Sequence, residues 1–180
     1  MRRMKSVVHR PLGAFVLSAA AAAIVLFLPG VARADDGQGF VGRLMGDGYW
    51  RVAVSPFSQH FRYSAEHRYV WAAGGEWQRS DDWLAGGSYF RNSFGQPSAY
   101  LYVGKRWPGL LGEPRLFAQA SAGMLYGYRG KYESKVPLNY KGFSPGALIG
   151  LGWQFNPHFS VTGHMLGDAG LMIQLSYDLR

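Results

Sequence analysis

Apolar and polar residues alternate along the last strand-length segment of the chain, residues 170–180. One face of this segment carries Leu171, Ile173, Leu175, Tyr177 and Leu179, and the other carries Met172, Gln174, Ser176, Asp178 and Arg180. Alternation with a period of two predicts a β-strand with one apolar face and one mixed face. Residues 147–155 and 159–164 alternate in the same way.

The sequence predicts eight strand-length segments, separated by turn residues such as Ser80-Asp81-Asp82 and Asn156-Pro157. They are residues 49–61, 69–79, 83–92, 98–107, 115–128, 143–155, 158–166 and 170–180. A soluble β domain would turn its apolar faces inward, whereas a membrane barrel would turn them outward to lipid. The strands are close to the roughly 9–11 residues that cross a bilayer.

Two further patterns favour the membrane. Tyr and Trp gather at strand ends, as in an aromatic girdle, and short breaks alternate with longer ones, as periplasmic turns alternate with external loops. We therefore expect an all-β, eight-stranded antiparallel transmembrane β-barrel. The C-terminal Leu179-Arg180 departs from the aromatic ending of many barrels.

The first 34 residues have the plan of a secretory signal peptide. Four basic residues precede the apolar run LGAFVLSAAAAAIVLFLPG, and Ala32-Arg33-Ala34 supplies a small-residue cleavage site. An uncleaved N-terminal anchor is the alternative. We expect residues 1–34 to be the signal and residues 35–180 to be a barrel domain in the outer membrane of a Gram-negative bacterium. Beyond the signal no apolar stretch approaches the ~20 residues of a membrane-spanning helix.

Charge and cysteine content exclude several function classes. Five of the 19 basic residues lie in the signal, so residues 35–180 carry 14 basic and 11 acidic side chains, a net charge of +3. No basic run favours nucleic-acid binding. Without cysteine there is no disulfide, thiol nucleophile or cysteine-based metal site. We expect a monomer with no cofactor and no metal.

The candidate chemistry lies where two strands end. His60 closes the first predicted strand, and Asn92-Ser93 closes the third, so all three are expected at the external rim. A serine needs a general base to act as a nucleophile or proton donor, and histidine is the usual partner. A His–Ser pair at the mouth of a membrane barrel suggests acyl-ester chemistry on lipids. Serine near a turn is also an ordinary turn residue.

Prolines and glycines suggest space in the barrel. Pro56 and Pro145 lie inside predicted strands, and because proline cannot donate to a β ladder, each implies a gap between strands where a lipid tail could enter. Strand-start placement is an alternative for Pro145. Interior-facing glycines, among them Gly104, leave room for an acyl chain, or else relieve strain in a small barrel.

Several motifs resemble the lipid A palmitoyltransferase (PagP) family of eight-stranded outer-membrane barrels. They are SPFSQHF, AGGEW, LAGGSYFRNSFGQPSAYLYVGKRW, FAQASAGMLYGY and SPGALIGLGWQF with HFSVTGHMLGDAGLMIQLSYDLR. The resemblance covers most of residues 35–180, in pattern rather than in long identities. It implies transfer of a palmitoyl chain from a phospholipid to lipid A.

The same resemblance assigns roles to residues. His60, preceded by Pro56, would be the base or proton shuttle, Ser93 the hydroxyl that works with it, and Gly104 the floor of the acyl pocket. The family has an Asp-Ser pair where this chain has Asn92-Ser93, and an amide can orient an imidazole but carries no charge. The first external loop is also shorter than usual, and the family's amphipathic N-terminal helix is poorly represented.

Two other functions stay open. His164 resembles the histidine in the last hairpin of the lipid A 3-O-deacylase (PagL) family, but the serine expected two residues later is Leu166. A small structural or adhesive barrel without catalysis is the third possibility. His67 and His158 are interpreted as loop residues, and no histidine spacing indicates a metal site.

Overall fold

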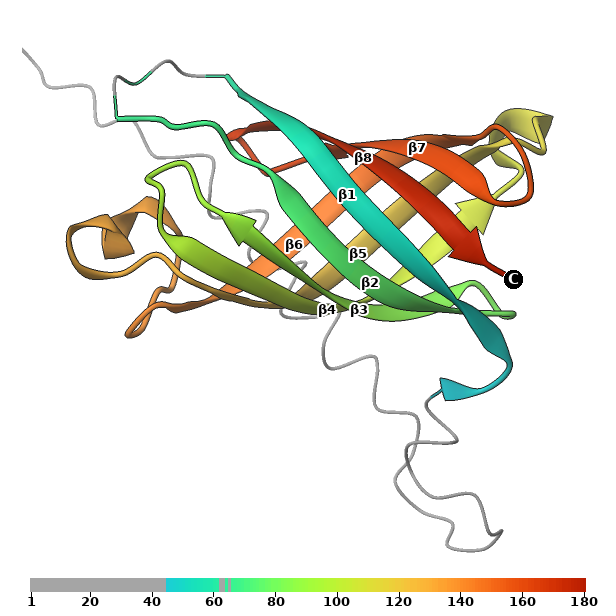
Figure 1. Ribbon diagram of the computed structural model, residues 1–180, viewed down its shortest axis with the longest axis horizontal. Coiled ribbons are helices and arrows are strands. Elements are labelled where there is room, and N and C mark those ends of the chain that lie inside the picture. The colour runs from blue at the N-terminus through green and yellow to red at the C-terminus, as the bar shows by residue number, and fades with distance from the viewer. Residues whose placement is uncertain (1–44, 62–63, 65) are drawn as a thin grey trace, which may run out of the picture.

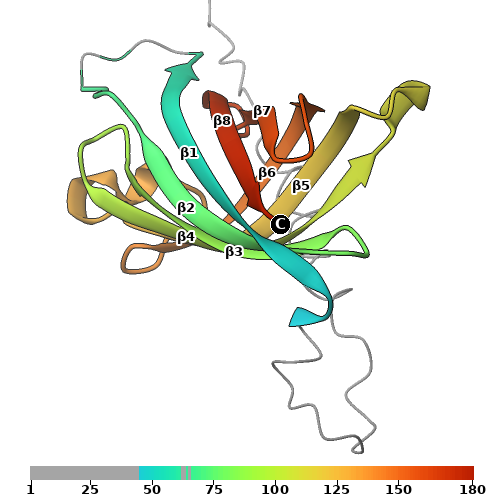
Figure 2. The same cartoon turned by 45° about the vertical axis from the view of Figure 1, so that its right-hand side comes forward.

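The computed structural model describes residues 45–61, 64 and 66–180, and in it eight antiparallel strands close into a single barrel (Figure 1). The strands are β1 (Gly48–His60), β2 (Ala72–Arg79), β3 (Trp83–Arg91), β4 (Pro97–Pro108), β5 (Leu116–Tyr126), β6 (Phe143–Gln154), β7 (Phe159–Met165) and β8 (Gly170–Leu179). Each strand pairs with its neighbours in sequence, and β8 returns to pair with β1 (Figure 2). The predicted signal peptide lies outside the described residues.

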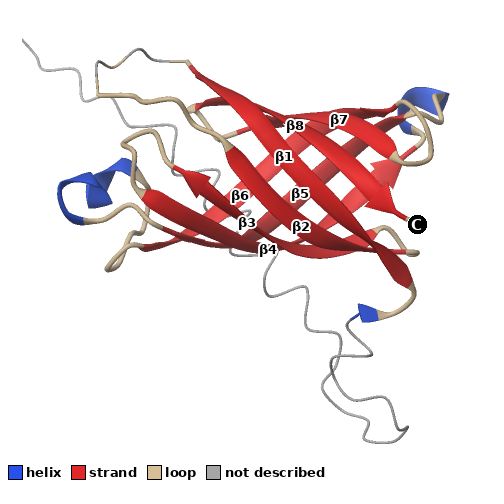
Figure 3. Cartoon of the chain, viewed as in Figure 1, coloured by secondary structure: helices blue, strands red, loops and turns tan. Residues whose placement is uncertain are grey.

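The two ends of the barrel differ in their connections. One end carries the β2–β3, β4–β5 and β6–β7 turns with the short 3-10 helix η1 (Leu110–Gly112). The other carries the two longest connections, β1–β2 and β5–β6, the second of which contains η2 (Gly130–Lys135) (Figure 3). Short turns face the periplasm in membrane barrels and long loops face outward. We therefore call these ends the periplasmic and external rims. No helix among the described residues is long and apolar enough to cross a membrane.

The predicted strands agree closely with the observed ones, and every boundary falls within three residues of its expected position. The largest difference is at β2, which begins at Ala72 rather than at residue 69. Pairing between β1 and β2 stops at Ser55 and Ala72, immediately before Pro56. Proline has no backbone N–H to donate, so the ladder cannot continue there.

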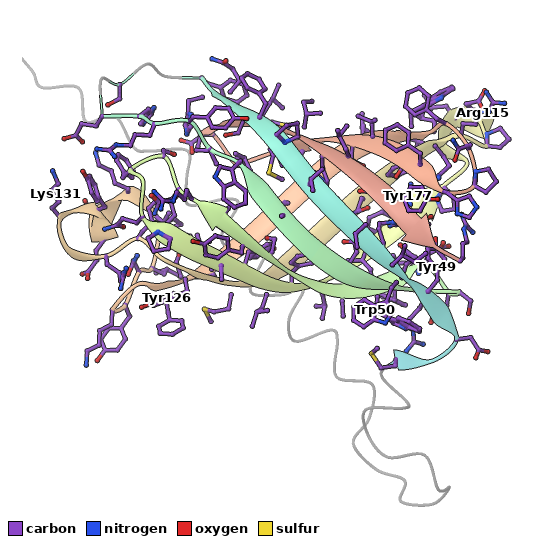
Figure 4. All side chains as sticks on the ribbon, viewed as in Figure 1. Tyr49, Trp50, Arg115, Tyr126, Lys131 and Tyr177 are labelled. Carbon is purple, nitrogen blue, oxygen red and sulfur yellow. The ribbon has the colours of Figure 1, made fainter. Side chains whose placement is uncertain are left out.

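Polar side chains fill the barrel and apolar side chains cover it. Inside, Arg51 and Glu76 are no more than 1% exposed, whereas Leu101 and Ile149 on the outside are 67% and 59% exposed. Outward aromatic side chains mark the two ends, with Tyr126 toward one and Trp50 and Tyr177 toward the other (Figure 4). This inversion of the usual core is the pattern of a transmembrane β-barrel, which confirms the predicted fold and agrees with the predicted outer-membrane location.

An ionic cluster occupies the periplasmic half of the barrel. The Arg51 guanidinium donates to Glu76 Oε1 at 3.0 Å, to Gln78 Oε1 at 3.0 Å and to both carboxylate oxygens of Asp178. Tyr102 donates to the other Glu76 oxygen at 3.0 Å. Burying these charges is tolerated because each finds a partner of opposite sign and further hydrogen bonds. The cluster links β1, β2, β4 and β8 across the interior.

The external half of the interior is lined differently. By strand alternation its inward positions include Leu125, Gly146, Leu148 and Met172, and all four keep partial solvent exposure although they point into the barrel. The inward positions around Arg51 are instead charged or polar, as at Glu76, Gln78 and Asp178. The interior thus changes from ionic near the periplasmic rim to a mixture of small polar and apolar side chains near the external rim.

Candidate functional site

His60 and Ser93 meet at the external rim. His60 is the last residue of β1 and Ser93 follows β3, and the imidazole Nε2 lies 2.7 Å from the Ser93 Oγ. The two residues are 33 positions apart in sequence, and closure of β1, β2 and β3 into adjacent strands brings them together. The structure therefore places the predicted pair within hydrogen-bonding distance. Its catalytic role stays a prediction.

Asn92 holds the turn that presents Ser93. Its side chain is 1% exposed, and its Oδ1 accepts hydrogen bonds from the backbone N–H groups of Phe94 and Gln96, both at 3.0 Å. Its Nδ2 donates to the Gly127 carbonyl at 3.4 Å. Among the described residues the amide makes no hydrogen bond to His60. The hydrogen bonds of Asn92 thus fix the turn that presents Ser93, and its predicted part in catalysis stays a prediction.

Loop residues that the sequence did not single out complete the site. The His67 ring lies against His60 with ring centroids 4.3 Å apart, and Phe94 contacts His67 edge-on. The backbone N–H of Arg68 donates to the Ser93 carbonyl at 2.7 Å, so the β1–β2 loop is tied to the β3–β4 turn. No spacing pattern could have identified His67, because its contact with His60 depends on how the loop crosses the rim.

The surroundings keep His60 uncharged at neutral pH. His60 is the last residue of β1 and lies at the external rim. Partial burial lowers the pKa of His60 below its usual 6.5, and the electrostatic influence of the neighbouring His67 side chain lowers it further. A neutral imidazole is the form that can accept the Ser93 proton. Burial raises the pKa of Tyr128, although a side-chain hydrogen bond with Ser93 opposes that shift.

Pro56 and Pro145 both lie beside gaps in the β ladder, as predicted. The register between β1 and β8 shifts between Val54 and Phe57, and residues 57–60 of β1 have no described partner in β2. On the far side, pairing of β6 with β7 begins only at Ile149, so the segment of β6 that contains Pro145 pairs with β5 alone. Both gaps lie in the external half of the wall.

The surroundings of Gly104 differ from the expected pocket floor. A Cβ added at Gly104 would lie 2.4 Å from the Ala120 carbonyl oxygen, 2.9 Å from Leu84 and 3.1 Å from Ser121. Leu84 is 2% exposed. Neighbouring atoms therefore already fill the space that the missing side chain was expected to leave. Glycine is required at this position by close strand packing.

His164 belongs to the interior and not to the rim pair. It is 2% exposed on β7, and neither ring nitrogen has a hydrogen-bond partner among the described residues. Position 166 is leucine, so the hairpin offers no serine of the deacylase type. His158 lies at the periplasmic end, where its Nδ1 is 3.0 Å from the Asp178 carbonyl oxygen. Within the described ranges, no cluster of three or more His, Asp or Glu could hold a metal ion.

Comparison with known proteins supports the architecture. No protein-family model matches the chain, and no curated protein matches it. Among solved structures it is similar to a de novo designed transmembrane β-barrel, with a TM-score of 0.54 and 14% identity over 74% of this chain and 98% of the designed one. The fold is that of a transmembrane β-barrel.

Two further solved structures are less similar. The designed barrel TMB2.3 gives a TM-score of 0.48 and 18% identity over 75% of this chain and 97% of its own. The attachment invasion locus protein Ail of Yersinia pestis, solved with the heparin analogue sucrose octasulfate, gives 0.42 and 10% over 74% and 99%. At such identities the likeness extends to the fold alone, and the palmitoyltransferase resemblance stays a prediction.

Proposed function

We propose that this protein is an outer-membrane acyltransferase that moves a palmitoyl chain from a phospholipid to lipid A. The observation that carries the proposal is the 2.7 Å contact between His60 Nε2 and Ser93 Oγ at the external rim. Both substrates of such a reaction are lipids that reach the rim from the membrane. The proposal needs no cofactor, since acyl transfer between oxygens requires only proton transfer and positioning.

The chemistry assigned to the pair is general acid–base catalysis. His60 takes the proton of the lipid A hydroxyl as that hydroxyl attacks the phospholipid ester carbonyl. It then returns the proton to the glycerol oxygen of the phospholipid, which leaves as a lysophospholipid hydroxyl when its bond to the acyl carbon breaks. Ser93 is the hydroxyl in contact with the base, and its turn is fixed by the Asn92 hydrogen bonds. General base catalysis of this kind contributes roughly 10²–10⁴-fold in rate.

The barrel wall supports lateral access for lipid tails. One ladder gap lies beside Pro56, next to the strand end that carries His60, and the other lies beside Pro145. An acyl chain that entered through a gap would meet apolar inward side chains of the external half, among them Leu125, Leu148 and Met172. We place the floor of its pocket at the stacked rings of Tyr100 and Tyr102, whose centroids are 4.9 Å apart, and not at Gly104.

Mass spectrometry of lipid A from a Gram-negative host expressing the chain tests the proposal. We expect one added palmitoyl group with the natural chain and none with Ser93→Ala or His60→Gln. Ser80→Ala, in a periplasmic turn, is the matched control and should keep the activity. An unchanged spectrum from folded protein would reject the transferase, and loss of an acyl group would identify a deacylase.

A non-catalytic structural or adhesive barrel is the second candidate. One observation favours it: among the described residues no carboxylate orients His60, because Asn92 stands in the usual acidic position and its amide is used by the turn. In that case the hydrogen bond between Ser93 and His60 only stabilises the structure of the external rim. The lipid spectrum would then be identical for the natural chain and both variants.

A further inference from the structure

Arg106 is a buried cation near the periplasmic rim. It lies on β4, is 7% exposed, and stacks its guanidinium on the Phe117 ring, with Cζ 3.3 Å from the ring centroid. Its Nη2 donates to Gln154 Oε1 at 2.9 Å. Stacking uses the faces of the planar guanidinium, and the other N–H groups along its edge make no hydrogen bond to any described residue. Those donors are not sealed from solvent.

The two buried arginines among the described residues, Arg51 and Arg106, differ in their ion-pair partners. Arg51 binds two carboxylates, those of Glu76 and Asp178. Arg106 has no ion-pair partner within the described part of the chain. Placing a cation away from water without an opposite charge is unfavourable. A counter-charge supplied from outside the chain would relieve this imbalance.

A pocket of about 480 Å³ opens beside Arg106 at the periplasmic rim. Its lining includes three arginines, Arg79, Arg106 and Arg180, and one carboxylate, that of Asp82. Arg79 and Arg180 each have an aspartate partner outside the lining, Asp81 and Asp178. The volume falls within the roughly 300–1,000 Å³ that is usual for small-molecule sites.

We propose that this pocket binds an oxyanion, a phosphate or carboxylate group, through the free edge of Arg106. A planar guanidinium presents two parallel N–H donors that match two oxygens of such a group. The exposed prolines of the lining, Pro108 and Pro114, accommodate a non-polar part of the ligand. Because the site opens at the periplasmic end, it is separate from the rim pair of His60 and Ser93. The group could come from a soluble periplasmic anion or from the headgroup of an inner-leaflet lipid.

Isothermal titration calorimetry of the folded chain with inorganic phosphate tests the site. The protein is placed in phosphatidylcholine nanodiscs, and the titration is repeated with Arg106→Gln and with Lys105→Gln. Lys105 is the adjacent cation, it does not line the pocket, and its Nζ lies 4.8 Å from the Trp83 ring centroid, so its variant removes the same charge elsewhere. We expect affinity to fall at least tenfold for Arg106→Gln and to stay within twofold for Lys105→Gln.

One further variant and one further lipid composition complete the experiment. Arg106→Lys keeps the positive charge but removes the two parallel N–H donors of the guanidinium. We expect this variant to fold and to bind phosphate at least fivefold more weakly. Repeating the phosphate titration in nanodiscs that contain phosphatidylglycerol distinguishes the two sources of the anion. Suppressed phosphate binding shows that the lipid headgroup competes for the site, and unchanged phosphate binding favours a soluble anion. Both results support the site. No binding by the natural chain in phosphatidylcholine would overturn it. Equal binding by Arg106→Gln, or an equal loss with Lys105→Gln, would also overturn it.

Discussion

The buried ionic cluster should dominate the stability of the periplasmic half of the barrel. Replacing Arg51 with methionine would leave the carboxylates of Glu76 and Asp178 without their shared cation, at no more than 1% exposure. Asp178 would keep only the partly exposed Arg180 at 3.3 Å. Removing one partner of a buried ion pair costs about 3–5 kcal/mol, because the remaining charge stays desolvated. We expect Arg51→Met to lower the free energy of unfolding by about 4 kcal/mol.

The assay is urea-induced unfolding of the barrel in lipid vesicles, followed by tryptophan fluorescence. Lys105→Met is the control, since it also exchanges a cation for methionine but at a position outside the cluster, and a change within about 0.5 kcal/mol is expected there. Adding Glu76→Gln to Arg51→Met removes one stranded charge and should recover about 1 kcal/mol or more. A single Arg51→Met variant within about 1 kcal/mol of the natural chain would refute this reasoning about stranded charge.

Three further predictions concern the rim and the interior. His60 must be neutral to act as a base and its pKa is lowered from 6.5, so transferase activity should decline on acidification only below pH 6.5. In a pH–rate profile, His67→Gln should move this acid limb toward higher pH, because the influence that lowers the His60 pKa is removed. An acid limb at the same pH in His67→Gln would contradict the assigned electrostatics. Asn92→Ala should lower the free energy of unfolding by about 2 kcal/mol, because two backbone N–H groups lose their acceptor; urea titration measures this, and lost activity with unchanged stability would instead indicate a direct catalytic role. Gly104→Ala should destabilise the barrel by about 1–3 kcal/mol through overpacking without changing the length of the transferred acyl chain in mass spectra; a shorter chain would restore Gly104 as the pocket floor.

Most of the fold could be predicted from the alternation of apolar and polar residues along the strands. In β8 the apolar residues Leu171 and Tyr177 face outward and Asp178 faces inward, and a period of two requires only local backbone geometry. The prolines were informative for a similar local reason. Pro56 cannot donate to a neighbour whichever strand that neighbour is, so an interrupted ladder was predictable without knowing the pairing.

The candidate site was predictable only in part. The sequence placed His60 and Ser93 at strand ends on one rim, and alternating short and long breaks assigned that rim to the outside. It could not show that the His67 ring would lie against His60, because loop paths depend on contacts between distant segments. It also could not show that the Asn92 Oδ1 accepts hydrogen bonds from its own turn, since those donors take their places only when the turn is formed.

The sequence by itself thus determined the strands, their order, the lipid-facing side and the candidate residues, because these follow from local periodicity and from what each side chain can donate or accept. The tertiary structure alone decided the interior. Whether the glycine at position 104 leaves a void depends on Leu84 from the neighbouring strand. Whether a buried arginine has a carboxylate partner depends on residues from other strands. Arg51 has two such partners, whereas among the described residues Arg106 has only the neutral Gln154 side chain. Charge balance and packing inside a closed barrel are sums over all its strands, and no single segment contains them.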